Sequence, residues 1–151
     1  MYTAYLKGSL KLSKTGEWWH NGQPFENKRV SDLFTRSVVW DPALKEYFVQ
    51  IGAQRASFDC EDTAFFVTSI DENTSPWTIS ISDGSSEQLQ AQTIEAGAED
   101  QLYCLVHGTH RARLTRAAHQ SLLQHVSTDN SLNIEGRLYI IKRAEDGIQD
   151  S

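Results

Sequence analysis

The first half of the chain alternates between apolar and polar residues over short stretches, a pattern typical of β-strands. An aromatic segment that begins at Gly16 runs into an Asn21-Gly22 pair, which is a strong hairpin signal. Residues 1–15 are polar and lysine-rich, and they predict either a lead-in strand or a loose arm. Three further strands are expected at residues 46–51, 54–60 and 63–70.

One helix is expected between these strands, and it should begin close to Ser31. A serine side chain can accept a hydrogen bond from the free N–H groups of the first turn, and Asp32 complements the positive end of the helix dipole. Asp41 should end the element, because the residue before Pro42 avoids the helical conformation. The positions at helical spacing that should face the core are Leu33, Phe34 and Val38.

The second half repeats the strand signals and also contains the strongest helical pattern. Turns at Asp83-Gly84 and Glu135-Gly136 predict two hairpins, and a helix is expected over residues 111–126. The apolar stripe of that helix consists of Leu114, Ala118, Leu122 and Val126. Strands are expected at residues 77–82, 88–94, 102–107, 132–134 and 137–141.

A polar segment at residues 71–76, which ends in proline, is the clearest change of composition in the chain. We take it as the boundary between two halves, residues 1–72 and residues 73–151. Each half combines strands with one helix, which suggests an internal duplication, although no residue-level repeat is visible. The sequence therefore predicts an α+β protein of two packed, β-rich halves with one helix each.

Composition narrows the classes of function. The 151 residues are 39% hydrophobic, which is enough for a core, and the net charge is −6. An acidic balance argues against a surface that coats nucleic acid or binds anionic membranes. The apolar runs are too short to span a membrane, and the N-terminus lacks a signal-peptide core, so we expect a cytoplasmic protein without membrane or DNA partners. Cys60 and Cys104 have no Cys-x-x-Cys partner, and in a reducing compartment both should be small buried hydrophobes.

Glu61 and Asp62 form an acidic pair that leads directly into the apolar strand at residues 63–70. A buried carboxylate is costly unless it is hydrogen-bonded or paired, so the two groups must face water or meet partners elsewhere in the fold. The pair could contact a ligand, take part in acid–base chemistry or bind a metal. Alternatively, the carboxylates cap backbone N–H groups or pair with an arginine.

Arg111, Arg113 and Arg116 form a basic cluster in an acidic chain. On the expected helix, Arg113 and Arg116 are three residues apart and would share a face. A guanidinium group suits a phosphate or a carboxylate, so the cluster could hold an anionic group. Alternatively, the cluster is a solvated face, or it forms ion pairs with acidic residues such as Asp62.

Trp18 and His20 should lie on one face of the aromatic strand, because side chains alternate along a strand. Either residue could contact a ligand, and either could be a packed part of the hairpin. His107 and His110 provide too few convergent ligands for a metal. No nucleophile motif and no phosphate-binding glycine loop is present, so we predict no catalytic residue, metal or cofactor. An enzyme that uses His20 with Asp62 stays an alternative.

Several motifs together resemble those of one bacterial family. They are Gly16-x-Trp18-x-His20-x-Gly22-x-Pro24, Leu33-Phe34, Tyr47, Glu61-Asp62-x-x-Phe65, Ala112-x-Leu114-x-Arg116 and Ile134-x-Gly136-x-x-Tyr139. The chain resembles the uncharacterised proteobacterial domain-of-unknown-function family 1285 from Gly16 to about Arg143. Phe25 and Ala64 stand where that family usually has isoleucine and proline.

The resemblance implies a two-part, β-rich arrangement whose second half is superficially similar to a pleckstrin-homology fold. It also implies a groove between the halves that takes a nucleotide-like ligand, with a link to signalling and no established activity.

Together, these observations predict a non-enzymatic small-ligand-binding module that binds a nucleotide-like molecule between its halves, in bacterial signal transduction. The arginines would hold an anionic group, the aromatic residues would form an apolar wall, and the histidine and carboxylates would orient the ligand. The expected ligand-binding residues are Trp18, His20, Glu61, Asp62, Phe65, Arg113 and Arg116. The alternative is a protein-interaction module, in which the second half binds a partner protein or exposed sheet edges pair two copies of the chain.

Overall fold

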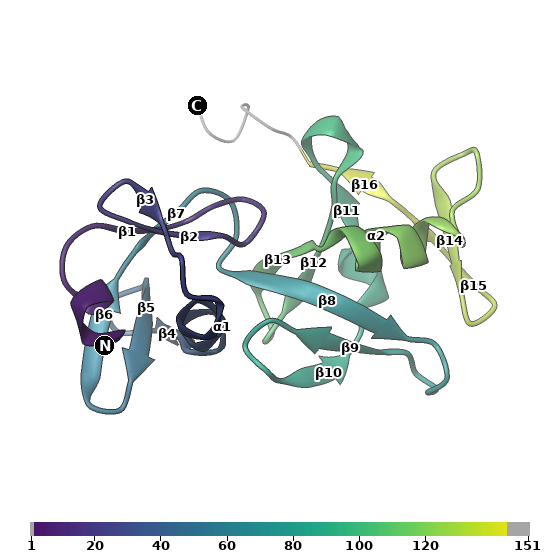
Figure 1. Cartoon of the computed structure of the whole chain (residues 1–151). Coiled ribbons are helices and arrows are strands. Elements are labelled where there is room, and N and C mark those ends of the chain that lie inside the picture. The colour runs from purple at the N-terminus through teal and green to yellow at the C-terminus, as the bar shows by residue number, and fades with distance from the viewer. Residues whose placement is uncertain (1, 145–151) are drawn as a thin grey trace. The chain divides into compact units, whose positions relative to one another are not determined.

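The computed structural model describes residues 2–144, and the chain divides into two compact units, Met1–Ala64 and Phe65–Ser151 (Figure 1). In the described part of each unit, one α-helix accompanies several strands, so the predicted α+β class is confirmed. None of the helices within residues 2–144 is long and apolar enough to cross a membrane. The likeness of the second half to a pleckstrin-homology fold stays a prediction.

The first unit contains two small sheets. In order, the first sheet consists of β3 (Gln23–Pro24), β2 (Trp18–His20), β1 (Leu10–Leu12) and β7 (Asp59–Cys60). The second consists of β4 (Val38–Asp41), β5 (Glu46–Ile51) and β6 (Gln54–Ser57). β1 pairs antiparallel with β2 and parallel with β7, and a short 3-10 helix over Tyr2–Leu6 precedes it. The predicted turn at Asn21-Gly22 is confirmed, because it joins β2 to β3 with His20 opposite Gln23.

The helix of the first unit, α1 (Lys28–Arg36), begins earlier and ends earlier than predicted. Asn27, rather than Ser31, is the N-cap, and its side chain accepts hydrogen bonds from the backbone N–H groups of Arg29 and Val30. The expected last turn is instead strand β4, in which Val38 pairs with Val49 of β5. β-Branched and aromatic residues favour a strand once a partner strand is available. The most buried core residues of the unit are Leu12, Trp18, Phe34 and Val49.

The second unit is built on a seven-stranded mixed sheet. Its strands, in order, are β10 (Ser86–Gln88), β9 (Thr78–Ile81), β8 (Phe65–Asp71), β13 (His110–Leu114), β12 (Leu102–Val106), β11 (Glu95–Ala96) and β16 (Lys142–Arg143). β8 and β13 are parallel, as are β11 and β16, and the other pairs are antiparallel. Helix α2 (Arg116–Leu123) packs against β8 and β13. β14 (Ser131–Ile134) and β15 (Arg137–Ile140) form a separate hairpin, visible at the yellow-green end of Figure 1.

The second unit starts before the composition break at residues 71–76. β8 precedes that break, yet it pairs with β9 and with β13 inside the seven-stranded sheet. Hairpin loops are often polar and contain proline, as domain linkers do. Here residues 72–77 form the loop that connects β8 to β9. The division between the units at residues 64 and 65 therefore differs from the division predicted from composition.

The predicted helix over residues 111–126 is wrong in its first part. Residues His110–Leu114 form β13, in which Ala112 and Leu114 are buried and alternate with half-buried arginines. The helix begins only after Thr115, whose hydroxyl caps it by accepting a hydrogen bond from the N–H of Ala118. Leu114 lies four residues before Ala118, so it fits the apolar spacing of the helix although it belongs to the strand. This coincidence explains why the helix was predicted to start too early. Consequently, Arg113 and Arg116 lie on different elements and do not share a helix face.

The other two predicted hairpins are confirmed, with one change. Asp83-Gly84 joins β9 to β10, and Glu135-Gly136 joins β14 to β15. The strand expected at residues 88–94 is not present, however. The observed strand, β10, ends at Gln88, and a 3-10 helix follows over Ala91–Thr93. The buried residues of this segment are Leu89, Ala91 and Ile94, whose spacing does not continue the alternation of a strand.

Candidate functional site

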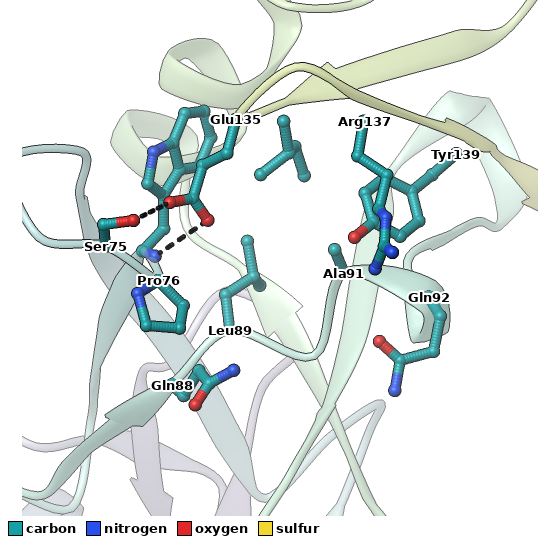
Figure 2. Close-up of a pocket in the computed structure, with 11 residues that line it drawn as sticks. Ser75, Pro76, Gln88, Leu89, Ala91, Gln92, Glu135, Arg137 and Tyr139 are labelled. Carbon is teal, nitrogen blue, oxygen red and sulfur yellow. Dashed lines mark hydrogen bonds between the residues drawn. The ribbon is translucent and has the colours of Figure 1, made fainter.

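A pocket of about 420 Å³ lies within the second unit (Figure 2). Three segments surround it: the residues that precede β9, the chain from the end of β10 into the following 3-10 helix, and the β14–β15 hairpin. We call it the hairpin pocket. It is lined by Ser75, Pro76, Trp77, Gln88, Leu89, Ala91, Gln92, Ile134, Glu135, Arg137 and Tyr139. Its volume is within the range of small-molecule sites.

Glu135 attaches the tip of the hairpin to one wall of the pocket. Its carboxylate accepts a hydrogen bond from the Ser75 hydroxyl at 2.8 Å and another from the Trp77 backbone N–H at 3.3 Å (Figure 2). Glu135 and Gly136 both have positive φ, 55° and 79°, as the tight turns of two-residue hairpins require. The turn chemistry therefore places a carboxylate beside two donors that lie about 60 residues earlier in the chain.

Arg137 supplies an unpaired positive charge on the opposite side of the pocket. Its guanidinium makes no hydrogen bond or ion pair with the residues that the structure describes, and Tyr139 lies beside it on the same strand (Figure 2). Leu89, Ala91 and Ile134 are buried beneath the pocket and form an apolar floor. A guanidinium, a phenol ring and an apolar floor together suit a planar molecule that carries an anionic group.

Two of the residues predicted to bind a ligand, Trp18 and His20, make structural contacts in the first unit. Trp18 is 1% exposed, its indole N–H donates to the Thr35 hydroxyl at 2.9 Å, and its ring packs edge-on against Phe34 and Phe58. His20 lies with its Nε2 2.5 Å from the Lys7 carbonyl oxygen. Trp18 is thus a core residue, and the ring of His20 is held against the N-terminal segment.

The acidic pair lies at the end of β7. Glu61 accepts a hydrogen bond from the backbone N–H of Lys14 at 3.0 Å, which is the structural alternative that the sequence left open for it. Glu61 is exposed and Asp62 is half-buried. The contact of Glu61 holds the segment after β7 against the turn that follows β1.

The remaining three predicted residues lie in the second unit and do not converge. Phe65 is buried and packs edge-on against the rings of His107 and His110. In the β8–β13 pairing, Phe65 lies opposite Ala112 and therefore faces away from the side that carries Arg113. Arg116 is exposed in the first turn of α2. The candidate ligand residues are thus divided between the two units, and none of them lines the hairpin pocket.

Of the two cysteines, Cys104 is buried as expected and Cys60 is not. Cys104 is buried on β12, where desolvation raises the pKa of its thiol to about 12. Cys60 is exposed as a residue, because β7 is short and lies at the edge of its sheet. Partial desolvation of its sulfur nevertheless raises its pKa to about 11. Both thiols are protonated at neutral pH, and neither is an activated nucleophile.

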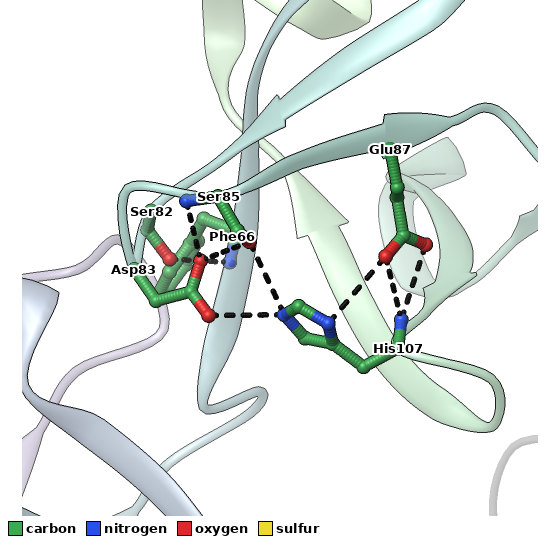
Figure 3. Close-up of polar contacts among 6 residues, drawn as sticks. All are labelled: Phe66, Ser82, Asp83, Ser85, Glu87 and His107. Carbon is green, nitrogen blue, oxygen red and sulfur yellow. Dashed lines mark hydrogen bonds and ion pairs between the residues drawn. The ribbon is translucent and has the colours of Figure 1, made fainter.

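A second polar cluster joins the β9–β10 turn to the β12–β13 turn (Figure 3). His107 Nε2 lies 2.9 Å from Asp83 Oδ2, and His107 Nδ1 lies 3.4 Å from Glu87 Oε1. The Ser85 hydroxyl donates to Asp83 at 2.5 Å and also approaches Nε2 of His107, at 3.4 Å. A catalytic triad needs serine and aspartate on different imidazole nitrogens. Here Asp83 and Ser85 both meet Nε2, and the Ser85 hydroxyl gives its proton to Asp83 and not to the imidazole. Although Glu87 lies on the Nδ1 side, the serine is thus not set up for activation by His107, and we interpret the cluster as a structural clasp.

We expect this clasp to make the second unit sensitive to acid. Burial alone would raise the pKa of Asp83, but hydrogen bonds from Ser85 and His107 outweigh it and lower that pKa below 3.8. A lowered pKa in the folded state means that the carboxylate stabilises the fold above its ordinary pKa, and that this stability is lost as pH falls through the folded-state pKa. Urea midpoints from about pH 6 to about pH 2 should therefore fall less steeply for Asp83→Asn than for the natural chain. Parallel slopes for the two proteins would contradict this assignment.

No group of three or more histidine, cysteine, aspartate or glutamate side chains within residues 2–144 is arranged to hold a metal ion. The residues of the hairpin pocket were not predicted as a site from the sequence.

The sequence does show that Arg137 and Tyr139 alternate along a predicted strand, which places both side chains on one face. The sequence carried no signal that this face meets Ser75 and Leu89.

Two solved structures have a fold similar to that of this chain. A DUF1285 family protein from Silicibacter pomeroyi DSS-3 matches with a TM-score of 0.63 at 14% identity, over 90% of this chain and 80% of that chain. A DUF1285 family protein from Shewanella baltica OS155 matches with a TM-score of 0.57 at 15% identity, over 78% of this chain and 91% of that chain. Neither a protein-family model nor a curated protein matches the sequence. The chain thus resembles family 1285, as its motifs predict, and at these identities the likeness is one of fold.

Proposed function

We propose that this protein is a non-enzymatic small-ligand-binding module and that the hairpin pocket holds the ligand. The observation that carries the proposal is the unpaired guanidinium of Arg137 beside Tyr139, above the apolar floor of a pocket of about 420 Å³. Arginine binds phosphate and carboxylate groups through its planar array of donors, and a tyrosine ring can stack on a planar group. No histidine, lysine or cysteine lines the pocket, and its one serine hydroxyl, that of Ser75, donates to Glu135 in the contact that holds the hairpin tip. Binding without catalysis is therefore the simplest role.

A nucleotide-like molecule has the required chemistry, because it combines an anionic phosphate with a planar base. The amide side chains of Gln88 and Gln92 add donors and acceptors at the open side of the pocket, where a base or a ribose could meet them (Figure 2). Such a module would act in bacterial signal transduction by sensing its ligand. The pocket is built entirely by the second unit, so the proposal does not depend on a groove between the halves.

A thermal-shift screen tests the proposal directly. The natural chain is screened with mononucleotides, dinucleotides and cyclic dinucleotides, with sulfate and phosphate as controls. A ligand at about 100 times its dissociation constant should stabilise the protein by about 2.7 kcal/mol, which is visible as a higher melting temperature. Arg137→Ala should abolish that shift.

Arg116→Ala is the matched control, because it removes the same charge from an exposed position of the same unit outside the pocket. It should retain the full ligand-induced shift. A shift that survives Arg137→Ala and disappears in Arg116→Ala would instead assign anion binding to Arg116, as the sequence analysis predicted. If no nucleotide shifts a cooperative melting transition, the ligand class proposed here is wrong.

A protein-interaction role is the second candidate, and one observation favours it. Leu138 and Ile140 are large apolar residues on β15, and each is 67% exposed. Neighbouring exposed apolar residues contribute to a surface that binds other proteins when they form a contiguous patch.

A further inference from the structure

β15 has one edge without a partner strand. Within residues 2–144 it pairs with β14 alone. The two-residue turn makes Ile134 and Arg137 a hydrogen-bonded pair, and hydrogen-bonded pairs then recur at every second residue. The hydrogen bond from the Ile141 N–H to the Asn130 carbonyl, at 2.9 Å, continues that alternation. The backbone groups of the intervening residues, Leu138 and Ile140, therefore point away from β14.

The same two residues expose their side chains. Leu138 and Ile140 lie on one face of β15, opposite the face whose Arg137 and Tyr139 line the hairpin pocket. Free N–H and C=O groups beside two exposed apolar side chains are the features of a strand that pairs with a strand of another chain. Short length and charged flanks, which β15 also has, weaken pairing with strands in general. A partner of opposite charge would offset the effect of the flanks.

The charges at the ends of β15 indicate which partner fits. Arg137 begins the strand, and Lys142 lies on β16, two residues after β15 ends. Neither cationic side chain has a hydrogen bond or an ion pair within the described part of the chain. This basic edge belongs to a protein of net charge −6. A second copy of the chain would bring one basic edge against another, which is unfavourable because like charges across paired strands repel.

We infer that the free edge of β15 binds an extended segment of a partner protein, in which apolar and acidic side chains alternate. The segment adds a strand to the β14–β15 hairpin through the outward backbone groups of Leu138 and Ile140. Its apolar side chains pack on these two residues, and its carboxylates approach Arg137 and Lys142. Leu138 and Ile140 face away from the hairpin pocket, so the backbone pairing does not rest on ligand binding there. The two proposals share only the charge of Arg137.

Amide hydrogen exchange of the full chain, measured by NMR, tests this inference. The probe is a short, end-capped peptide of alternating valine and glutamate, titrated to millimolar concentration. A matched peptide of alternating valine and lysine is the control. The first peptide should slow exchange at Leu138 and Ile140 by about tenfold or more, because both amides become hydrogen-bonded. The lysine peptide should leave both rates unchanged.

Leu138→Pro separates backbone pairing from side-chain contact. Proline removes the outward N–H and keeps the bonds to β14, since edge strands tolerate proline where the N–H faces solvent. It should abolish the protection of Ile140 by the valine–glutamate peptide, whereas Leu138→Ala should weaken it only in part. Any nucleotide-induced thermal shift should survive Leu138→Pro.

Two results would overturn the inference. One is equal slowing by both peptides, or no slowing by either. The other is protection of Leu138 and Ile140 that rises with protein concentration in the absence of peptide, which would assign the edge to a second copy of the chain.

Discussion

Trp18→Ala should destabilise the first unit by about 3–5 kcal/mol, the range for removing a large aromatic side chain from a core. Trp18 is 1% exposed, and its ring packs edge-on against Phe34 and Phe58. The substitution also removes the hydrogen bond from the indole N–H to the Thr35 hydroxyl. Native-state hydrogen exchange of the full chain, which reports local stability residue by residue, should show the loss in the amides of β1, β2 and α1.

Trp19→Ala is the matched control. Trp19 is the next residue of the same strand, faces the other side of the sheet and is half-buried. Its replacement should cost about half as much, because about half as much apolar surface leaves water on folding. If both variants lose the same stability, the assignment of Trp18 to the core is wrong. If Trp18→Ala keeps the stability of the natural chain but loses ligand binding, Trp18 belongs to a binding site, as the sequence suggested.

Leu132→Ala should destabilise the second unit by about 2–5 kcal/mol. Leu132 is fully buried on β14 and lies opposite Tyr139 of β15. A cavity at this position would loosen the hairpin that forms one wall of the hairpin pocket. Urea unfolding followed by circular dichroism should show the lower stability, and any nucleotide-induced thermal shift should decrease with it.

Leu138→Ala removes the same atoms from the facing strand of the same hairpin, and it serves as the control. Leu138 is 67% exposed, so its replacement should change stability by no more than about 0.5 kcal/mol. Equal losses for the two variants would show that the hairpin does not pack as described. The pair also links two experiments, because Leu138→Ala should weaken binding of the valine–glutamate peptide while leaving the fold intact.

Short-range features of the fold could be predicted from the sequence where a few adjacent residues decide the backbone. The reversals at Asn21-Gly22, Asp83-Gly84 and Glu135-Gly136 are confirmed because a tight hairpin turn needs residues that tolerate positive φ. The strand at β12 was visible in the same way, because a continuous apolar run between turns favours a central strand. The α+β class follows from these local signals together.

Predictions failed where two local signals competed. Ser31 and Asn27 are both good N-cap residues, and the position of the apolar residues Val30 and Phe34 on the core side selected Asn27. At Leu114 the spacing suited a helix and a strand equally, and pairing of β13 with β8 and β12 decided for the strand. This choice also separated Arg113 from Arg116, on which the predicted anion site depended.

By itself, the sequence determined the three tight hairpin turns, most of the extended segments and that each half has one helix. Those outcomes depend on residues within a few positions of one another, whose φ preferences and alternation act locally. Tertiary structure alone decided that β8 joins the second unit, because its partner β13 lies more than 40 residues later. Tertiary structure also formed the hairpin pocket. Glu135 accepts a hydrogen bond from Ser75, 60 residues away, and Arg137 and Tyr139 of the same hairpin lie above the apolar floor of the pocket. Such contacts form only when distant segments bury apolar surface together, and no local pattern encodes which segments will meet.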